Sequence, residues 1–290
     1  MSPLALVKLT PLMALTSGKV DTKVALIDGP VATDHPDLVS ENIRALPGKR
    51  GGACALINSA ACAHGTFVAG ILCAKRNSAA PAICPNCTLL VRPIFAETPS
   101  GNGQMPSAPP EELAAAIIEC IGAGARIINL SVDLAQPSSK GQRELEEALG
   151  HAAKRGVIVV AAAGNQGTLG SSAITRHQWA IPVVACDDRG RPISQSNLGS
   201  SIGRLGLSAP GLAITSLGTN GKPLTLGGTS IATPFVTGSI ALLWSEFPTA
   251  TAAQVKLAVT QTNLRRRAAV VPPMLDAWAA YQTMKAGLRG

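Results

Sequence analysis

Short apolar runs alternate along the chain with longer segments in which apolar residues recur at helical spacing. The alternation begins near Lys23 and continues towards the C-terminus. The runs that we interpret as strands cover residues 23–28, 88–95, 126–132, 157–163, 182–186 and 212–216. Helices are predicted to open at His64 and behind Ser230, and to cover residues 111–124, 141–155, 251–263 and 274–285.

This alternation predicts one doubly wound α/β domain built on a mostly parallel sheet. The run at 157–163, VIVVAAA, is apolar at every position, which is typical of a parallel strand covered on both faces. Neither a long linker nor an internal repeat interrupts the pattern, so we expect residues 1–290 to form a single domain. Residues 1–20 are expected to form a peripheral N-terminal segment.

Polar side chains follow two of the predicted strands. Asp28 ends the first strand and is followed by the breaker Gly29-Pro30. Asn165 lies in a Gly-Asn-Gln-Gly turn directly after the strand at 157–163. Because open α/β sheets place their functional groups at the carboxyl ends of the strands, we expect both side chains to face the same crevice.

A histidine and a serine open two of the predicted helices. His64 begins a helix with one apolar face, and a histidine in such a position is more often structural than catalytic. Ser230 follows two glycines at the start of an apolar helix, where it could simply cap the helix end. The same position would also stabilise an oxyanion, because main-chain N–H groups and the positive end of the helix dipole point outward there.

Together these four residues have the chemistry of an activated nucleophile. The imidazole of His64 can accept the proton of Ser230, and the carboxylate of Asp28 can hold the imidazole in the required tautomer. The Asn165 amide and the main-chain N–H of Ser230 can then donate to the oxyanion. The order Asp, His, Ser along the chain is the order found in subtilisin.

Four segments around these residues resemble the signatures of the subtilisin-like serine proteases, the subtilases. They are VALIDGP at Asp28, HGTFVAG at His64, AAAGNQG at Asn165 and GGTSIATPFVTG at Ser230. HPDL, INLS and SAPG extend the resemblance over about residues 20–285. It implies a three-layer subtilisin-like sandwich and a serine endopeptidase, a hydrolase with Asp28, His64 and Ser230 as its triad and Asn165 in its oxyanion hole. The substrate-binding residues that it implies are Asn129, Leu130, Ser131, Val132, Ala163 and Gly164.

Parts of the sequence narrow this resemblance. IDGPV at Asp28 and the PNC…PIF stretch are similar to subtilases that mature ribosomally made precursor peptides of the cyanobactin type. The ring-closing branch of that group carries a helical insertion before the histidine, and the short interval between Asp28 and His64 favours hydrolysis over ring closure. A transamidase (macrocyclase) on the same scaffold and a general degradative subtilase are the alternatives. Ser131-Val132-Asp133 replaces the usual SLG or SWG, so the wall of the primary specificity pocket is expected to differ, and Asp133 could place a negative charge beside the bound peptide.

The net charge of +8 raises a non-enzymatic alternative, a nucleic-acid-binding α/β domain. The densest basic cluster, Arg265–Arg267, has no interleaved aromatic residues on which bases could stack. In addition, no P-loop and no complete GxGxxG follows a predicted strand in the sequence. We therefore expect a solvated basic face and a peptide as the partner, with no nucleic acid.

The sequence shows neither a signal peptide nor an apolar run long enough to span a bilayer. We therefore predict a cytoplasmic monomer that does not bind membranes. The segment before Asp28 is too short for a folded pro-domain, so the enzyme would be made in active form. Because an unrestricted protease would be toxic there, we expect narrow specificity for a dedicated precursor peptide.

The chain contains seven cysteines, so at least one is unpaired. Cys54 and Cys62 flank a short polar loop, and Cys84 and Cys87 form a CPNC motif ahead of a predicted strand. A zinc site would need a comparable second pair, and a thioredoxin-type motif would follow a strand rather than precede it. We expect buried free thiols with one or two local disulfides, whose pairing the sequence leaves open.

No metal or cofactor is predicted. Calcium-binding subtilases supply oxygen ligands in the segment after the histidine helix, where this chain has Lys75-Arg76. Asp37 alone does not make a calcium site.

Overall fold

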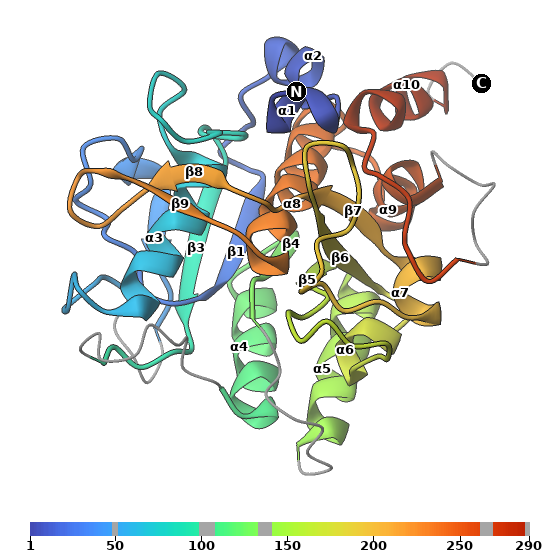
Figure 1. Ribbon diagram of the computed structural model, residues 1–290, viewed down its shortest axis with the longest axis horizontal. Coiled ribbons are helices and arrows are strands. Elements are labelled where there is room, and N and C mark those ends of the chain that lie inside the picture. Colours follow the sequence, from blue (N-terminus) through green and yellow to red (C-terminus); the bar gives the residue numbers. More distant parts are fainter. Residues whose placement is uncertain (48–51, 99–107, 133–140, 262–268, 288–290) are drawn as a thin grey trace.

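The computed structural model describes residues 1–47, 52–98, 108–132, 141–261 and 269–287. A parallel sheet of seven strands lies at the centre of the protein, in the order β2-β3-β1-β4-β5-β6-β7 (Figure 1). The α/β prediction and the parallel central sheet are thereby confirmed. The strands are β1 (Lys23–Asp28), β2 (Ile43–Ala45), β3 (Thr88–Pro93), β4 (Ile127–Leu130), β5 (Ile158–Ala162), β6 (Ala180–Cys186) and β7 (Leu207–Pro210).

Strand β1 lies in the middle of the sheet, between β3 and β4. Its Leu26 is paired with Val91 of β3 and with Asn129 of β4. Leu26 faces one apolar core, whereas the next residue, Ile27, faces the other. Successive side chains of a strand point to opposite faces, so the sheet is buried on both sides.

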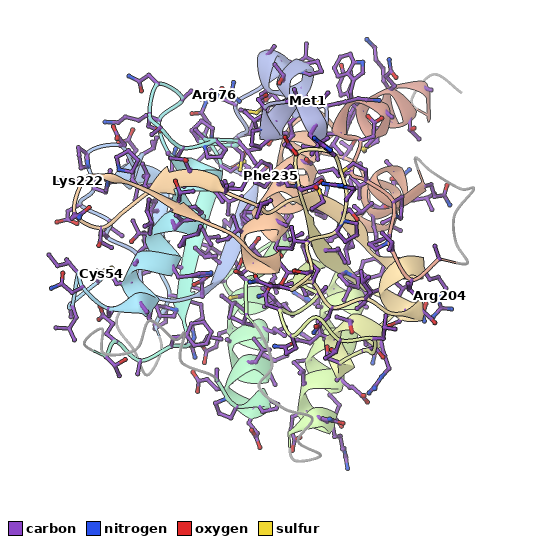
Figure 2. All side chains as sticks on the ribbon, viewed as in Figure 1. Met1, Cys54, Arg76, Arg204, Lys222 and Phe235 are labelled. Carbon is purple, nitrogen blue, oxygen red and sulfur yellow. A yellow bond between two sulfur atoms is a disulfide. The ribbon has the colours of Figure 1, made fainter. Side chains whose placement is uncertain are left out.

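Helices form the two outer layers. The helices α3 (Ala60–Cys73) and α8 (Thr229–Glu246) cover one face, and α4 (Pro110–Gly122) and α5 (Gln142–Arg155) cover the other, where they pack against each other (Figure 1). Nearly all of α8 is buried, including Phe235 near the middle of the molecule (Figure 2). The structure thus has the predicted three layers, and the buried helix whose N-terminal turn lies at the sheet is α8.

The remaining helices lie at the periphery of the sheet. The N-terminal segment contributes to packing there, because Leu9 and Leu12 are fully buried in the core on the α8 side. Among the described residues, no helix combines the length and the apolar character needed to cross a membrane. These helices are α1 (Pro3–Leu6), α2 (Leu9–Leu15), the 3-10 helix η1 (Ser40–Asn42), α6 (Ala173–Arg176), α7 (Ser200–Leu205), α9 (Ala252–Gln261) and α10 (Ala277–Gly287).

Two elements differ from the predicted ones in position. Helix α3 begins at Ala60, one turn ahead of His64, because Ser59 caps it by accepting a hydrogen bond from the main-chain N–H of Cys62. The predicted strand at 212–216 lies outside the central sheet. It is β8 (Ile214–Leu217), which forms an antiparallel hairpin with β9 (Pro223–Leu226).

Candidate active site

Close packing of α3 against the end of β1 brings Asp28 and His64 together. Asp28 is the last residue of β1, and His64 lies in the second turn of α3. The approach requires glycine at position 65, because a Cβ atom on Gly65 would lie 2.4 Å from the carbonyl oxygen of Pro30. As a result, His64 Nδ1 lies 2.7 Å from Asp28 Oδ1. The main-chain N–H of Gly29 donates to the same carboxylate oxygen at 2.6 Å.

Ser230 reaches His64 from the N-terminal turn of α8. Its Oγ lies 3.0 Å from His64 Nε2. Gly228, directly before the helix, has a φ of +133°, which L side chains rarely adopt, so this turn needs glycine. Ser230 is in the first turn, where a main-chain N–H has no acceptor within the helix. The structure thus places the three predicted triad residues in one hydrogen-bonded series.

Asn165 lies beside Ser230 because Thr229 ties its loop to α8. Asn165 Oδ1 accepts hydrogen bonds from the main-chain N–H of Thr229 at 2.9 Å and from Thr229 Oγ1 at 3.1 Å. The main-chain N–H of Gly164 donates in turn to Thr229 Oγ1 at 3.2 Å. Since a main-chain N–H can only donate, the atom facing it is the amide oxygen, and Nδ2 occupies the other end of the carboxamide. The motif analysis missed Thr229, although its place directly before Ser230 in GGTS points to it.

The carbonyl group of Ser230 is bonded to Ser131, the residue that follows β4, rather than to its own helix. Pro234 stands four residues after Ser230 and lacks the N–H that would otherwise bond to the Ser230 carbonyl oxygen. Ser131 Oγ donates to that oxygen instead, at 2.9 Å. The hydroxyl of Ser131 therefore fills a gap that Pro234 leaves beneath the nucleophile.

Two further side chains hold Ser131 in this position. Asn129 Nδ2 donates to Ser131 Oγ at 2.7 Å, and Thr237 Oγ1 donates to Asn129 Oδ1 at 2.7 Å. Asn129 is fully buried, as is Leu130, so neither side chain can contact a peptide as a substrate-binding residue would. Instead, the Asn129 amide supports the serine that supports the nucleophile.

The other predicted substrate-binding residues are also inward-facing. Ser131, Val132 and Ala163 are 3%, 5% and 7% exposed, and Gly164 is buried. Contacts with a peptide would therefore come mainly from their main-chain groups. Asp133, which follows them, lies outside the described residues.

Two opposing effects set the pKa of His64. Burial by itself lowers it, because a buried imidazole is harder to charge. The attraction of the Asp28 carboxylate and its hydrogen bond act in the other direction and prevail, so the pKa of His64 is raised above its ordinary value of about 6.5. The fully buried Asp28 thus favours the imidazolium form that proton transfer from Ser230 would create.

Basic side chains occupy main-chain carbonyl groups around the loop that follows α3. The Arg76 guanidinium donates to the carbonyl oxygens of Met13, Thr16 and Ile83. Lys75 Nζ donates to the carbonyl oxygen of Pro36 at 2.6 Å. Calcium needs such oxygens as ligands, and here cationic side chains already use them. The donor set around this loop therefore does not fit a bound calcium ion.

The cysteines pair only in part. Cys54 and Cys62 form a disulfide, whereas Cys84 and Cys87 are buried free thiols. Among the described residues, the one cluster of potential metal ligands consists of Cys54, Cys62 and Glu97. Its two sulfur atoms are bonded to each other in the structure, so the disulfide form of the cluster has no thiolate to offer a metal.

The chain matches the model of the Subtilase family over residues 19–277. It is 32% identical over 251 residues to Subtilisin DY of Bacillus licheniformis, an alignment that covers 84% of this chain and 85% of that protein. It is also 32% identical over 246 residues to the Thermostable alkaline protease of Halalkalibacterium halodurans, covering 83% of this chain. The chain spans only 61% of the length of that protease.

Solved structures with the same fold include two proteases of higher coverage. The protease domain of PatA superposes with a TM-score of 0.81 and 31% identity, covering 93% of this chain and 97% of that chain. Prenylagaramide maturation protease PagA superposes with a TM-score of 0.81 and 28% identity, covering 95% of this chain and 98% of that chain.

Proposed function

Since the chain belongs to the subtilase family, we propose that it is a serine endopeptidase that hydrolyses peptide bonds through an acyl-enzyme on Ser230. The proposal depends above all on one geometric observation. Asp28 Oδ1, the two ring nitrogens of His64 and Ser230 Oγ are joined in series by contacts of 2.7 and 3.0 Å. Both lie within the range expected for a nucleophile, its base and the group that orients the base.

In the proposed reaction, Ser230 Oγ attacks the scissile carbonyl carbon while His64 Nε2 accepts its proton. Asp28 stabilises the imidazolium that results. The oxyanion accepts hydrogen bonds from the main-chain N–H of Ser230 and from Asn165 Nδ2, whose orientation Thr229 fixes. The imidazolium then gives its proton to the leaving amine, and water releases the acyl group by the same steps in reverse.

The substrate in this proposal is a ribosomally made precursor peptide, cut between its leader and its core. The support is the likeness to PagA, whose name is that of a maturation protease, and to the protease domain of PatA. Hydrolysis is favoured over ring closure because the described residues between Asp28 and α3 form only η1 and the short β2. These described residues therefore contain no helical insertion of the kind that covers the active site in the ring-closing branch.

Two measurements test the chemistry. A fluorophosphonate should label Ser230 in the native protein, and Ser230→Ala should abolish both labelling and turnover while leaving the melting temperature close to that of the wild type. Labelling that persists in the variant would exclude Ser230 as the nucleophile. The product mass then separates the reactions, since a hydrolysed peptide gains one water and a cyclised peptide does not.

The substrate class is tested separately. We expect a higher kcat/KM on a precursor peptide with its leader than on casein or on short generic peptides. Equal or faster cleavage of casein would instead indicate a general degradative protease.

A cytoplasmic location and a monomeric state complete the proposal. The Cys54–Cys62 disulfide offers a test of location, because disulfides persist mainly in oxidising compartments. Thiol labelling of protein quenched directly in cells should find both cysteines reduced if the enzyme works in the cytoplasm. Light scattering of the purified protein would give its oligomeric state.

A further inference from the structure

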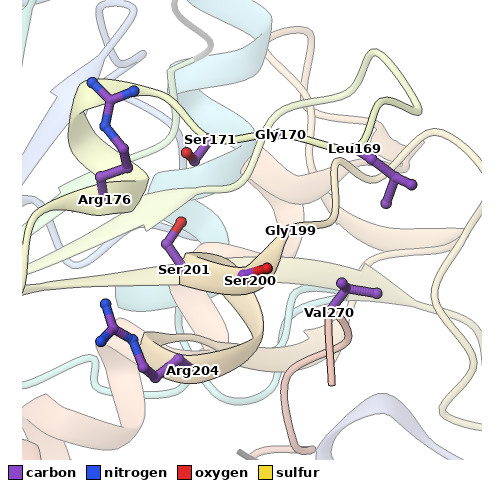
Figure 3. Close-up of a pocket in the computed structure, with 9 residues that line it drawn as sticks. All are labelled: Leu169, Gly170, Ser171, Arg176, Gly199, Ser200, Ser201, Arg204 and Val270. Carbon is purple, nitrogen blue, oxygen red and sulfur yellow. The ribbon is translucent and has the colours of Figure 1, made fainter. Parts of the chain in front are cut away.

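A pocket of about 720 Å³ lies between α6 and α7, and none of the triad residues lines it (Figure 3). One end is polar and contains Arg176 and Arg204. In the view of Figure 3 Ser201 lies between these two arginines, and Ser171 lies beside Arg176. Leu169 and Val270 form an apolar part of the lining on the other side (Figure 3). Pockets of this size hold small ligands or several side chains of a peptide.

The polar end of the pocket has unused hydrogen-bonding capacity. Within the part of the chain that the structure describes, neither Arg176 nor Arg204 has an ion pair or a side-chain hydrogen bond, and both are exposed. Ser201 Oγ is buried and has no hydrogen-bond partner among those residues. A buried hydroxyl without a partner is uncommon in folded proteins, and Ser201 lines the same pocket as the two unpaired guanidinium groups. The two guanidinium groups match an anionic ligand.

The pocket is connected to the active-site loop by a short ladder of main-chain hydrogen bonds. The segment 167–170, which leaves Asn165, pairs with 195–198: the N–H of Gly167 donates to the Gln195 carbonyl at 2.8 Å, and the N–H of Gly170 donates to the Leu198 carbonyl at 2.8 Å. Asn165 stands at one end of this ladder. Leu169 and Gly170, which line the pocket, stand at the other.

This connection limits the distance between the pocket and the site of bond cleavage. Four Cα–Cα steps of about 3.8 Å separate Asn165 from Leu169, so the Cα atom of Leu169 at the rim of the pocket lies at most about 15 Å from the Cα atom of Asn165. An extended peptide rises about 3.3 Å per residue. About five residues of an extended peptide are therefore enough to span the distance from the oxyanion donor to the rim at Leu169.

We propose that this pocket is a specificity site that binds a carboxylate side chain of the peptide substrate, an Asp or Glu several residues from the cleaved bond. Guanidinium groups bind carboxylates through two parallel hydrogen bonds. Leu169, which is 77% exposed, offers an apolar contact for a neighbouring residue of the same peptide. This inference rests on the proposed peptidase function, and it adds a chemical requirement to the substrate.

Binding and turnover test the site independently. The probes are fluorescein-labelled twelve-residue peptides, built on a sequence that a library digest shows to be cleaved, with one Glu moved through successive positions. Each has a partner with Gln at the same position. With Ser230→Ala protein, at least one Glu peptide should bind about 10-fold more tightly than its Gln partner, and added salt should reduce the difference. If the wild type cleaves no library peptide, the proposed function fails, and the same titration on undigested library peptides still tests the pocket.

Substitutions then assign the effect to the pocket. Arg176→Gln and Arg204→Gln should each raise KM for the preferred Glu peptide towards that of the Gln peptide and leave the Gln peptide unaffected. Arg204→Glu should reverse the preference in favour of a Lys peptide. Arg189→Gln changes an exposed arginine outside the pocket and is the matched control. It should change neither the KM for the Glu peptide nor the preference for Glu over Gln. Equal binding of Glu and Gln peptides at every position, or an equal loss on both peptides in the variants, would overturn the proposal.

Discussion

The protonation of His64 decides the pH range in which Ser230 can be activated. Only the neutral imidazole can accept the serine proton, and the pKa of His64 is raised by Asp28. We therefore expect kcat/KM to fall as the pH is lowered through a midpoint above about 6.5. In Asp28→Asn the effect of burial is no longer opposed, so the midpoint should move below that value. A profile that is flat between pH 5 and 8 would contradict the role of His64 as the base.

The same pKa predicts how stability depends on pH. A group whose pKa is raised by folding stabilises the protein fully below its unfolded pKa, and this contribution is lost as the pH rises through the folded pKa. The active, neutral form of His64 is therefore the form without this stabilisation. In Ser230→Ala protein, the melting temperature should fall between pH 6 and 8 as this stabilisation is lost. NMR titration of the His64 ring nitrogens should give a pKa at the midpoint of that fall.

Asn165 and Thr229 act as a pair, and their variants should differ in a predictable way. Asn165→Ala removes the oxyanion donor, so kcat should fall by roughly 10²–10³ with little change in KM. Thr229→Val keeps the main-chain N–H that bonds Asn165 Oδ1 but loses both hydroxyl contacts, so a smaller fall of about 2- to 10-fold is expected. A change confined to KM in Asn165→Ala would make Asn165 a substrate-binding residue instead.

At the scale of secondary structure, the junction of β4 and α8 determines where the nucleophile stands. Ser131→Ala leaves the part-buried carbonyl group of Ser230 without a donor, because Pro234 has no N–H to replace it. We expect a loss of about 1–3 kcal/mol in the free energy of unfolding and a lower kcat. Chemical denaturation and steady-state kinetics measure the two effects.

A second substitution separates positioning from substrate contact. Pro234→Ala restores the N–H that can bond to Ser230 within the helix, so the double variant Ser131→Ala/Pro234→Ala should recover part of both losses. If Ser131 acted only as a wall of the substrate site, Pro234→Ala would restore neither stability nor kcat. Thr237→Val, which removes the outer member of the series, should have a weaker effect in the same direction.

The sequence predicts the central elements well and the contacts between distant residues poorly. The apolar runs that predict β1, β3, β4, β5 and β6 extend over five to eight residues of sequence. The three-residue β2 and the four-residue β7, LSAP, do not stand in runs of that length, so they cannot be distinguished from loops. Asp28, His64, Asn165 and Ser230 are found because each lies in a motif at the end of a strand or the start of a helix. The bonds from Ser131 to Ser230 and from Thr237 to Asn129 span many residues, so they exist only once the fold has formed. The residues that line the pocket between α6 and α7 are likewise spread over 169–270, and they belong to no sequence motif.

For the molecule as a whole, we predict that stability does not depend on calcium. EDTA should shift the melting temperature by no more than about 1–2 °C, because Arg76 and Lys75 already occupy the carbonyl groups around the loop after α3. Arg76→Ala leaves three carbonyl groups without their donor and should lower the melting temperature by several degrees, on the order of 2–4 °C per kcal/mol lost. Arg189→Ala is the control for removal of an exposed arginine. A large drop with EDTA in the wild type would show that calcium binds elsewhere.

The guanidinium group of Arg76 has one property that no bound ion shares, since it is part of the chain. A dissociable ion stabilises a protein by mass action, so its contribution depends on the free concentration of the ion and falls on dilution or dialysis. A covalently attached cation has no such dependence. The segments that Arg76 joins, at Met13, Thr16 and Ile83, therefore stay linked equally well at nanomolar and millimolar protein, and in citrate or phosphate buffers that sequester divalent metals.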